Sequence, residues 1–160
     1  MKKNVLFLFV LFLLVCNAFA QNPVVSVSGE ITANTNWTNN NVYLLQGYVY
    51  VKNNATLTIQ PGTIIKGDKD TKGTLIIARG AKIIADGTEQ LPIVFTSNQP
   101  AGDRTYGDWG GLILCGKAPI NKPGSEGEIE GGVNNASGDA LYGGTDPNDN
   151  SGILRYVRIE

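Results

Sequence analysis

Histidine is absent from all 160 residues of the sequence. Sites that depend on an imidazole, such as Ser-His-Asp and Cys-His nucleophilic centres and nearly all ordinary zinc sites, are therefore excluded. Cysteine is scarce, with one residue at Cys16 and one at Cys115. If the first 20 residues are removed, Cys115 remains alone, so no disulfide can form within the chain. We expect Cys115 to be a small buried side chain.

The sequence also lacks an excess of positive charge. Its 13 Lys and Arg residues are balanced by 14 Asp and Glu, which gives a net charge of −1. Removal of Lys2 and Lys3 with the N-terminus lowers that charge by two, to about −3. Such a balance argues against nucleic acid or an anionic membrane as a partner. Apolar residues at helical spacing are missing after the N-terminus, and glycine reaches 20 residues, a composition typical of an all-β protein.

The single long apolar run lies at the N-terminus and has the features of a signal peptide. Two lysines precede apolar residues 5–15, and residues 18–20 form a small-x-small cleavage site. The run is shorter than the roughly 20 residues that a membrane-spanning helix requires. We therefore predict a cleaved signal peptide over residues 1–20, export to the outside or outer surface of the cell, and no transmembrane segment. Cys16 leaves a less favoured alternative, a lipoprotein anchored through this cysteine.

Short β-type runs recur in residues 42–95, with glycines at matching places. Three units share two apolar residues followed by a glycine: Val42, Leu44 and Gly47; Leu57, Ile59 and Gly62; Leu75, Ile77 and Gly80. The last two units are 18 residues apart. Alternation sends the aliphatic side chains of a strand to one face, and the glycine allows a bend with positive φ. Each unit therefore indicates strand, bend, strand, and stacked units would build a solenoid.

This repeat predicts which side chains form the core. Five aliphatic residues are expected to point into one core, namely Leu57, Ile59, Leu75, Ile77 and Ile83. Three threonines are expected to face outward, namely Thr56, Thr58 and Thr74. A left-handed β-helix of hexapeptides also has an 18-residue period, but every third hexapeptide lacks the required aliphatic residue. Two strands and a variable loop per tier favour a right-handed parallel β-helix, with residues 92–96 as the third strand of their coil.

The regions around these tiers predict further parts of the domain. Residues 21–41 are expected to form a short strand that leads into a cap, with Trp37 covering the end of the solenoid. Residues 42–160 are expected to form the coils, with a long polar insertion rich in Gly, Asn and Asp at about 121–151. An insertion of that length is either functional or partly disordered. Residues 153–159 predict one closing strand.

Four segments carry a resemblance to a known family. They are residues 54–63, 92–97, 107–114 and 116–121. Together they resemble a family of secreted or outer-surface right-handed β-helix proteins of Bacteroidetes-type bacteria, whose fold is similar to that of pectate lyases. The resemblance covers residues 40–160. Members of the family are longer, which implies that this chain is an N-terminal fragment, and the resemblance implies no catalytic role for any residue.

Tyr106, Asp108 and Trp109 are the candidate ligand-binding residues. With Asp103 and Arg104 just upstream, they could offer an aromatic face for stacking beside polar groups for sugar hydroxyls. The alternative, which we favour, is that Trp109 packs inward at the start of a strand while two glycines allow the next coil to approach closely. The site is therefore a hypothesis about the loop that precedes this strand.

A second candidate site is an oxygen-rich segment near the C-terminus, formed by Asp146, Asn148, Asp149 and Asn150. The segment lacks the glycine and the closing glutamate of an EF-hand, which excludes that motif. A looser Ca²⁺ site and an ordinary solvated turn remain as alternatives. No other cofactor is expected.

Two classes of function remain after these exclusions. The favoured one is an exported, non-catalytic β-helix module that presents loops to a polysaccharide, a cell-surface component or another partner. The other is a carbohydrate-active enzyme, a polysaccharide lyase or glycosidase, which rests on fold analogy, with Arg155 and Arg158 as candidate lyase bases. We also expect end-to-end self-association of the fragment through its last strand, whose edge is unpaired.

Overall fold

The computed structural model describes residues 21–160, which form thirteen β-strands and one short 3₁₀ helix, η1 (Pro123–Ser125). The strands are β1 (Val24–Ile31), β2 (Thr35–Trp37), β3 (Val42–Val51), β4 (Thr56–Ile59), β5 (Ile64–Gly67), β6 (Thr74–Ile77), β7 (Lys82–Asp86), β8 (Ile93–Ser97), β9 (Gly111–Leu114), β10 (Gly127–Glu128), β11 (Leu141–Tyr142), β12 (Gly152–Arg155) and β13 (Val157–Ile159). The predicted signal peptide and Cys16 lie outside the described residues. No helix within the described part of the chain has the length and apolar character needed to cross a membrane.

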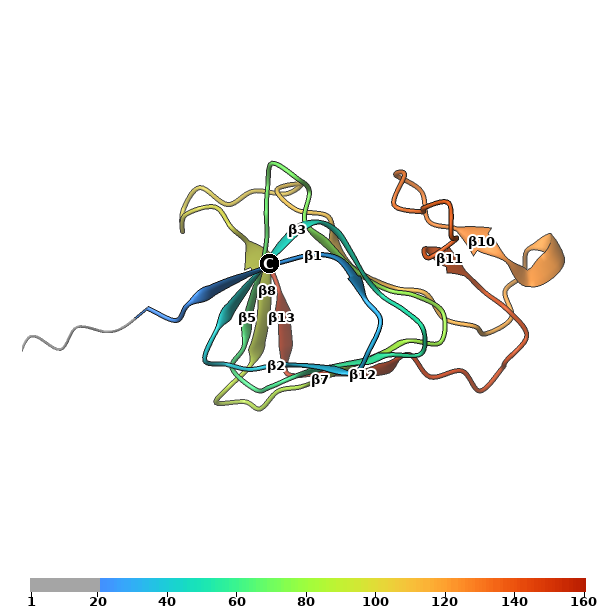
Figure 1. Ribbon diagram of the computed structural model, residues 1–160, viewed down its shortest axis with the longest axis horizontal. Coiled ribbons are helices and arrows are strands. Elements are labelled where there is room, and N and C mark those ends of the chain that lie inside the picture. Colours follow the sequence, from blue (N-terminus) through green and yellow to red (C-terminus); the bar gives the residue numbers. More distant parts are fainter. Residues whose placement is uncertain (1–20) are drawn as a thin grey trace, which may run out of the picture.

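Parallel strands stack into coils with a three-sided cross-section (Figure 1). Face A holds β13, β8, β5 and the first half of β3; face B holds the second half of β3, β6 and β9; face C holds β12, β7, β4 and β2. Strand β3 turns from face A to face B at Gly47, which has a φ of 65°. Strand β1 pairs with both halves of β3, with a register shift at that corner. The structure therefore confirms the predicted all-β parallel β-helix.

The inward side chains of the three faces meet in one core. The five predicted core residues, Leu57, Ile59, Leu75, Ile77 and Ile83, are all at most 2% exposed and belong to a single cluster. Thr56 and Thr58 are half-buried on the outer side of face C. Thr74 alternates with the core residues Leu75 and Ile77 as predicted, but the expectation that it faces solvent was wrong, because it is fully buried. Its hydroxyl donates to the carbonyl oxygen of Lys72 at 2.7 Å, and the backbone of Gly110 lies directly against it.

The stacking of the units differs from the predicted 18-residue repeat. Leu57 pairs with Ile83 of the next coil, whereas Leu75 pairs with Val49. The matching sequence units therefore lie on neighbouring faces of the solenoid, and stacked positions are further apart along the chain. The three predicted bends do hold, since Gly47, Gly62 and Gly80 have φ values of 65°, 81° and 86°. Strand β8 begins a new coil, because it pairs with β5.

The N-terminal strands β1 and β2 form a coil of their own. Strand β1 lies along β3, and β2 lies along β4. Trp37 at the end of β2 is 4% exposed and stacks on Tyr43, with ring centroids 4.6 Å apart and an interplanar angle of 13°. This side chain is therefore part of the core cluster.

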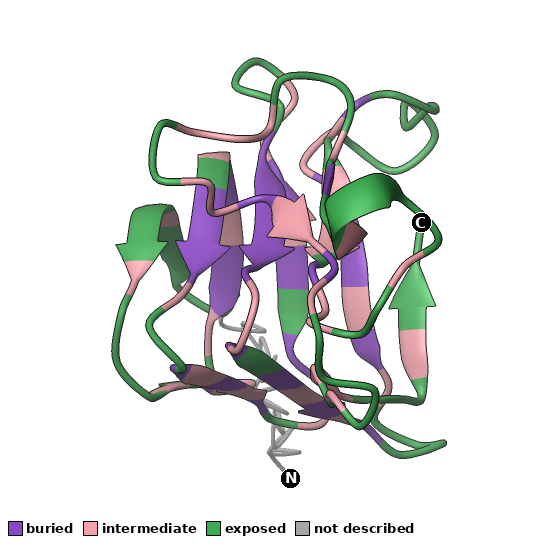
Figure 2. Ribbon diagram, turned by 90° about the vertical axis from the view of Figure 1, so that its right-hand side faces the viewer, coloured by how far each residue is buried: buried purple, intermediate pink, exposed green. Residues whose placement is uncertain are grey.

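The predicted insertion at about 121–151 is part of a longer segment between β9 and β12, residues 115–151, which we define as the arm and which folds back over the outer side of face B. It contains η1 and the antiparallel pair β10–β11. Between the arm and face B lies a second buried cluster of Tyr50, Ile76, Cys115 and Ala140. This cluster buries Ile76 of β6 on the side away from the inner core. Figure 2 shows these buried strands behind the loops of the arm. Cys115 is a buried side chain, as predicted, and its burial raises the pKa of its thiol.

The predicted closing strand over residues 153–159 is divided in two by a corner. Strand β12 continues face C beside β7, and β13 continues face A beside β8. Tyr156 forms the corner with a φ of 48°, a value that a residue other than glycine rarely adopts. No glycine or proline marks this bend, which is why the sequence indicated one continuous strand.

Candidate functional site

The loop of residues 98–110 connects β8 to β9 and carries the predicted ligand-binding residues. Asp108, which is 1% exposed, holds this loop from beneath. Its Oδ2 accepts hydrogen bonds from the Ser97 hydroxyl at 2.9 Å and from the Thr105 backbone N–H at 3.0 Å. Its Oδ1 lies 3.0 Å from the ammonium of Lys69. The carboxylate thus ties the loop to its own strand and to the preceding coil.

Those contacts keep Asp108 ionised. The Thr105 N–H, the Lys69 ammonium and the Ser97 hydroxyl lower the pKa of Asp108 to about 2, although burial alone would raise it. The sequence predicted Asp108 as a ligand contact, and the structure places its side chain below the loop. Its role in the geometry is to position the neighbouring residues.

A cleft of about 460 Å³ opens above this loop. Its lining residues are Ser97, Arg104, Thr105, Tyr106, Gly107, Trp109 and Glu160. Tyr106 is 98% exposed, so its ring is free to contact a ligand. Two of the three predicted residues, Tyr106 and Trp109, therefore line one cleft.

Trp109 combines the two roles that the sequence left open. Its ring packs against the core, parallel to Phe95 with centroids 6.5 Å apart and an interplanar angle of 6°, and it also lines the cleft. Its indole N–H donates to the carbonyl oxygen of Glu160 at 3.0 Å. Gly67 lies under the side chain, where an added Cβ would come within 2.4 Å of the Trp109 Cβ. The indole is consequently held in one position.

Arg104, which the sequence placed just upstream of the three candidate residues, also lines the cleft. Its Nε donates to the carbonyl oxygen of Gln99 at 3.1 Å, and its Nη1 donates to the Thr96 hydroxyl at 2.9 Å. The same Nη1 lies 3.5 Å from the carboxylate of Glu160. The signal that the sequence offered for this residue was its place between Gly102 and Gly107, in a loop that joins two strands. The bonds to Gln99 and Thr96 depend on how the loop folds back on β8, which the sequence did not reveal.

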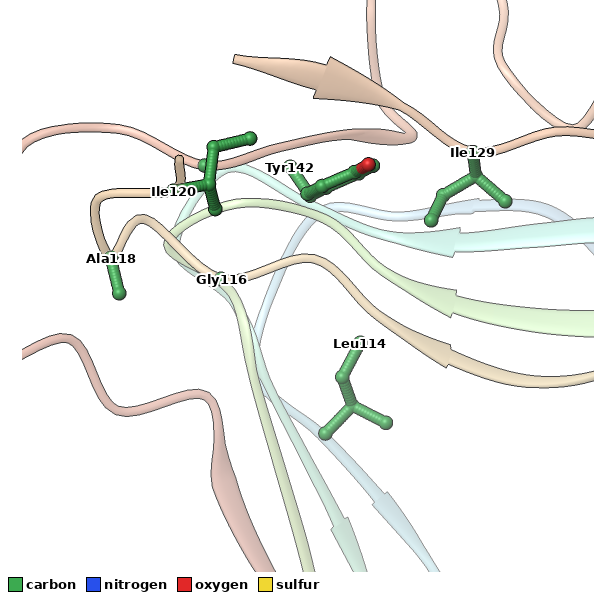
Figure 3. Close-up of a pocket in the computed structure, with 7 residues that line it drawn as sticks. Leu114, Gly116, Ala118, Ile120, Ile129 and Tyr142 are labelled. Carbon is green, nitrogen blue, oxygen red and sulfur yellow. The ribbon is translucent and has the colours of Figure 1, made fainter. Parts of the chain in front are cut away.

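The apolar cleft under the arm is a second concave surface, with a volume of about 270 Å³. In Figure 3, Ile120, Tyr142 and Ile129 of the arm lie on one side of the chain at Gly116, and Leu114 of β9 lies on the other. Ala118 and Gly143 complete a lining that contains no charged side chain. The cleft under the arm offers apolar contact but few polar groups that could orient a ligand. The loop cleft is therefore the better candidate for binding a polar ligand.

Three of the four predicted calcium residues accept hydrogen bonds from backbone N–H groups through their side chains. Oδ1 of Asp146 accepts from the N–H of Asn148 at 3.0 Å, and Oδ1 of Asn150 accepts from the N–H of Gly152 at 2.8 Å. Asp149 Oδ2 accepts from the N–H of Lys117 at 2.7 Å. Between residues 21 and 160, no group of three His, Cys, Asp or Glu side chains is placed to hold a metal ion. Calcium binding here stays a prediction.

The two arginines considered as lyase bases lie on the last strands. Arg155 donates from Nε and Nη2 to the two carboxylate oxygens of Asp86 on the neighbouring strand, at 2.5 and 2.9 Å. Arg158 pairs with the carboxylate of Glu160. Neither arginine lines the loop cleft.

Parallel strands stacked into coils with three faces define the class of parallel β-helix proteins. A family model described as a pectate-lyase like β-helix domain matches residues 29–160. The chain belongs to this family. Neither a curated protein nor a solved structure matches the chain. The resemblance drawn from the sequence is thereby confirmed for the fold family, while the bacterial origin and the status as a fragment stay predictions.

Proposed function

We propose that this chain is an exported, non-catalytic β-helix module that binds a polysaccharide in the loop cleft. The observation that carries the proposal is the set of Arg104, Tyr106 and Trp109 around one concave surface. Aromatic rings offer apolar faces to a sugar ring, and a guanidinium donates to hydroxyl or carboxylate oxygens. Aromatic side chains beside a few polar groups that can orient a ligand are typical of ligand sites.

Preorganisation of the cleft supports binding. Trp109 is fixed by Phe95 and by its bond to Glu160, and Arg104 is fixed by two hydrogen bonds to the chain around β8. Side chains that are already ordered lose little conformational freedom when a ligand arrives, so more of the contact free energy appears as affinity. The exposed Tyr106 is the adaptable member of the set.

The acidic groups around the cleft support a role without catalysis. Most glycosidases use two carboxyl groups, one of which must be protonated to act as the general acid. Asp108 has a pKa of about 2 and is buried beneath the loop, so it is poorly suited to that role. The carboxylate of Glu160 is paired with Arg104 and Arg158.

Export is proposed from the N-terminal sequence alone. Residues 1–20 have the basic start, the apolar run and the small-x-small site of a signal peptide. A polysaccharide outside the cell is the ligand that an exported protein would meet. The lipoprotein alternative through Cys16 is distinguished by the mass of the mature N-terminus, which carries a diacylglycerol only in that case.

A glycan panel with matched tyrosine variants tests the proposal. The panel would contain neutral and acidic polysaccharides, each with calcium and with a chelator. We expect at least one polysaccharide to bind, and Tyr106→Ala to weaken it by about 2 kcal/mol, roughly 30-fold, as for an aromatic anchor. Tyr156→Ala is the control, because Tyr156 is also exposed and does not line the cleft.

Three results of this experiment would contradict the proposal. The absence of binding to every polysaccharide, or equal loss in Tyr106→Ala and Tyr156→Ala, would remove the cleft as the site. Shorter products in the bound polysaccharide would show an enzyme instead. Binding that is seen with calcium and lost with the chelator would show that calcium is required. It would support the segment around Asp146 as the calcium site.

A further inference from the structure

Three successive coils place a cation at the corner between face B and face C. Lys52 follows β3, Arg79 follows β6 and Lys117 follows β9. The pairing of β3 with β6 and of β6 with β9 stacks these corners on one another. Backbone bonds from Ala78 to Val51 and from Cys115 to Ile77 continue that stacking into the turns. The cations follow the paired residues Val51, Ile77 and Leu114 by one, two and three residues, so they form a staggered row along the corner.

Acidic residues neutralise the first two cations of this row. Lys52 Nζ lies 2.6 Å from Oδ2 of Asp139 in the arm and 3.2 Å from Oε1 of Glu30 in β1. Arg79 Nη1 lies 2.8 Å from Oε2 of Glu126, also in the arm. The arm is therefore fastened along the corner by two ion pairs.

Lys117, the third cation, has no carboxylate within 4 Å of its ammonium among residues 21–160. Its ammonium is next to Gly80, where an added Cβ would come within 2.6 Å of Nζ. Its backbone is fixed, because its N–H donates to Asp149 at 2.7 Å and its carbonyl oxygen accepts from the N–H of Asp146 at 3.1 Å.

Lys117 lines a pocket of about 220 Å³ that is rich in hydrogen-bond donors. The other lining residues are Arg79, Gly143, Gly144, Thr145 and Asp146. Arg79 uses Nη1 for Glu126 and for the carbonyl oxygen of Gly143, and its Nε and Nη2 donate to no acceptor in the described part of the chain. The backbone N–H groups of Gly144 and Thr145 also donate to no acceptor among the described residues. Asp146 is the one acidic residue of the lining, and its Oδ1 accepts from the N–H of Asn148.

We infer that this donor-rich pocket binds an oxyanion, with Lys117 as its counter-charge and with Arg79, Gly144 and Thr145 as hydrogen-bond donors. Charged donors and backbone N–H groups that converge are the groups that carboxylate, sulfate and phosphate oxygens require. The anion is either a free inorganic ion or the acidic group of a larger molecule such as a sugar acid. The pocket is separate from the loop cleft, since the two share no lining residue.

The test is an NMR titration of the isotopically labelled chain with inorganic sulfate, inorganic phosphate and glucuronate. Chloride at equal ionic strength gives the baseline. We expect saturable shifts of the Gly144 and Thr145 amides with at least one of the three anions. Lys117→Gln should weaken this binding at least about tenfold, as the loss of a charged donor does, while Lys117→Arg should retain it. Lys82→Gln is the control, because it removes the same charge from an exposed residue of β7 outside the pocket.

Every outcome of the titration bears on the inference. Saturation by sulfate or phosphate alone supports a free inorganic anion, and saturation by glucuronate alone supports the acidic group of a larger ligand. No shift beyond chloride, or equal weakening in Lys117→Gln and Lys82→Gln, overturns the site. Tyr106→Ala should leave the titration unchanged, so failure of the carbohydrate proposal and failure of the anion site can be told apart.

Discussion

At the scale of single residues, two ionised carboxylates hold the parts of the molecule that depart from regular coils. Asp108 fixes the loop over the cleft, and Asp139 fixes the arm. Burial alone would raise the pKa of Asp139, but hydrogen bonds from Lys52 and Asn135 hold it below its usual value. For Asp108 the Thr105 N–H and Lys69 do the same. Both groups therefore favour the folded state in their ionised form.

Asp108→Asn should lower the stability of the protein at neutral pH and matter little in strong acid. The folded pKa of about 2 lies below the value of about 3.9 in an unfolded chain, so ionised Asp108 stabilises the fold above about pH 4. That contribution is lost as the pH falls through 4 toward 2. Urea unfolding should show a lower midpoint for the variant at pH 7 and a difference that narrows at pH 2. A constant difference across this range would contradict the role of the charge.

Substitutions by aspartate distinguish inward from outward positions on neighbouring faces. Leu75→Asp and Thr74→Asp place a carboxylate at fully buried positions and should each cost more than about 4 kcal/mol, enough to prevent folding. Thr58→Asp, on the half-buried outer side of face C, should change the free energy of unfolding by about 0.5 kcal/mol or less. Circular dichroism and urea unfolding measure all three. A folded Thr74→Asp protein would show that the backbone of Gly110 does not close off this position from solvent.

Alternation along the strands predicted the core positions, because every second side chain of a strand points to the same face. Thr74 escaped this rule, because the backbone of Gly110 from a later coil covers it. In the cleft, the sequence indicated Tyr106 and Trp109, whereas the stacking of Trp109 on Phe95 and the position of Arg104 depend on how the loop of residues 98–110 folds back against β8. Such contacts join residues that are not regularly spaced in the chain, so a repeat in the sequence does not reveal them.

At the scale of elements, the arm was the part that the sequence described least well. Its apolar residues Ile129, Val133 and Ala140 are scattered and show no strand or helix period. They pack on Tyr50 and Ile76, which lie outside the inner core cluster that holds their strand neighbours Val51 and Ile77. The long polar insertion is therefore an ordered cover, and its order comes from tertiary contacts that local pattern does not encode.

Asp139→Asn should loosen the arm without unfolding the coils. The change removes the ion pair with Lys52 and weakens the bond from Asn135, which together hold this end of the arm. Hydrogen exchange should become several-fold faster for arm amides such as those of Ile129 and Ala140, because the opening of the arm costs less free energy. Amides of β6 and β7 should change little. Glu128→Gln is the matched control, since Glu128 is an exposed arm residue without an ion pair in the described structure; equal acceleration in both variants would contradict the clamp.

At the scale of the whole molecule, the solenoid was predictable and its stacking was not. Glycines at Gly47, Gly62 and Gly80 marked the bends, and the aliphatic runs marked the strands. The strands on the different faces of a coil resemble one another in sequence. The 18-residue repeat, which relates strands on neighbouring faces, therefore looked like a repeat between stacked coils. Loops of different length then shift the true partners, as the pairing of Leu57 with Ile83 shows.

The central claim, that the loop cleft binds a polysaccharide and leaves it intact, is tested most directly by tryptophan emission. The chain has two tryptophans: Trp37 is 4% exposed in the core, and Trp109 lines the cleft. Titration with the polysaccharide panel in the presence of acrylamide should reveal one polymer that saturably protects Trp109 from quenching while its chain length stays constant. Binding with unchanged emission and quenching, or shortening of the polymer during the titration, would contradict the account.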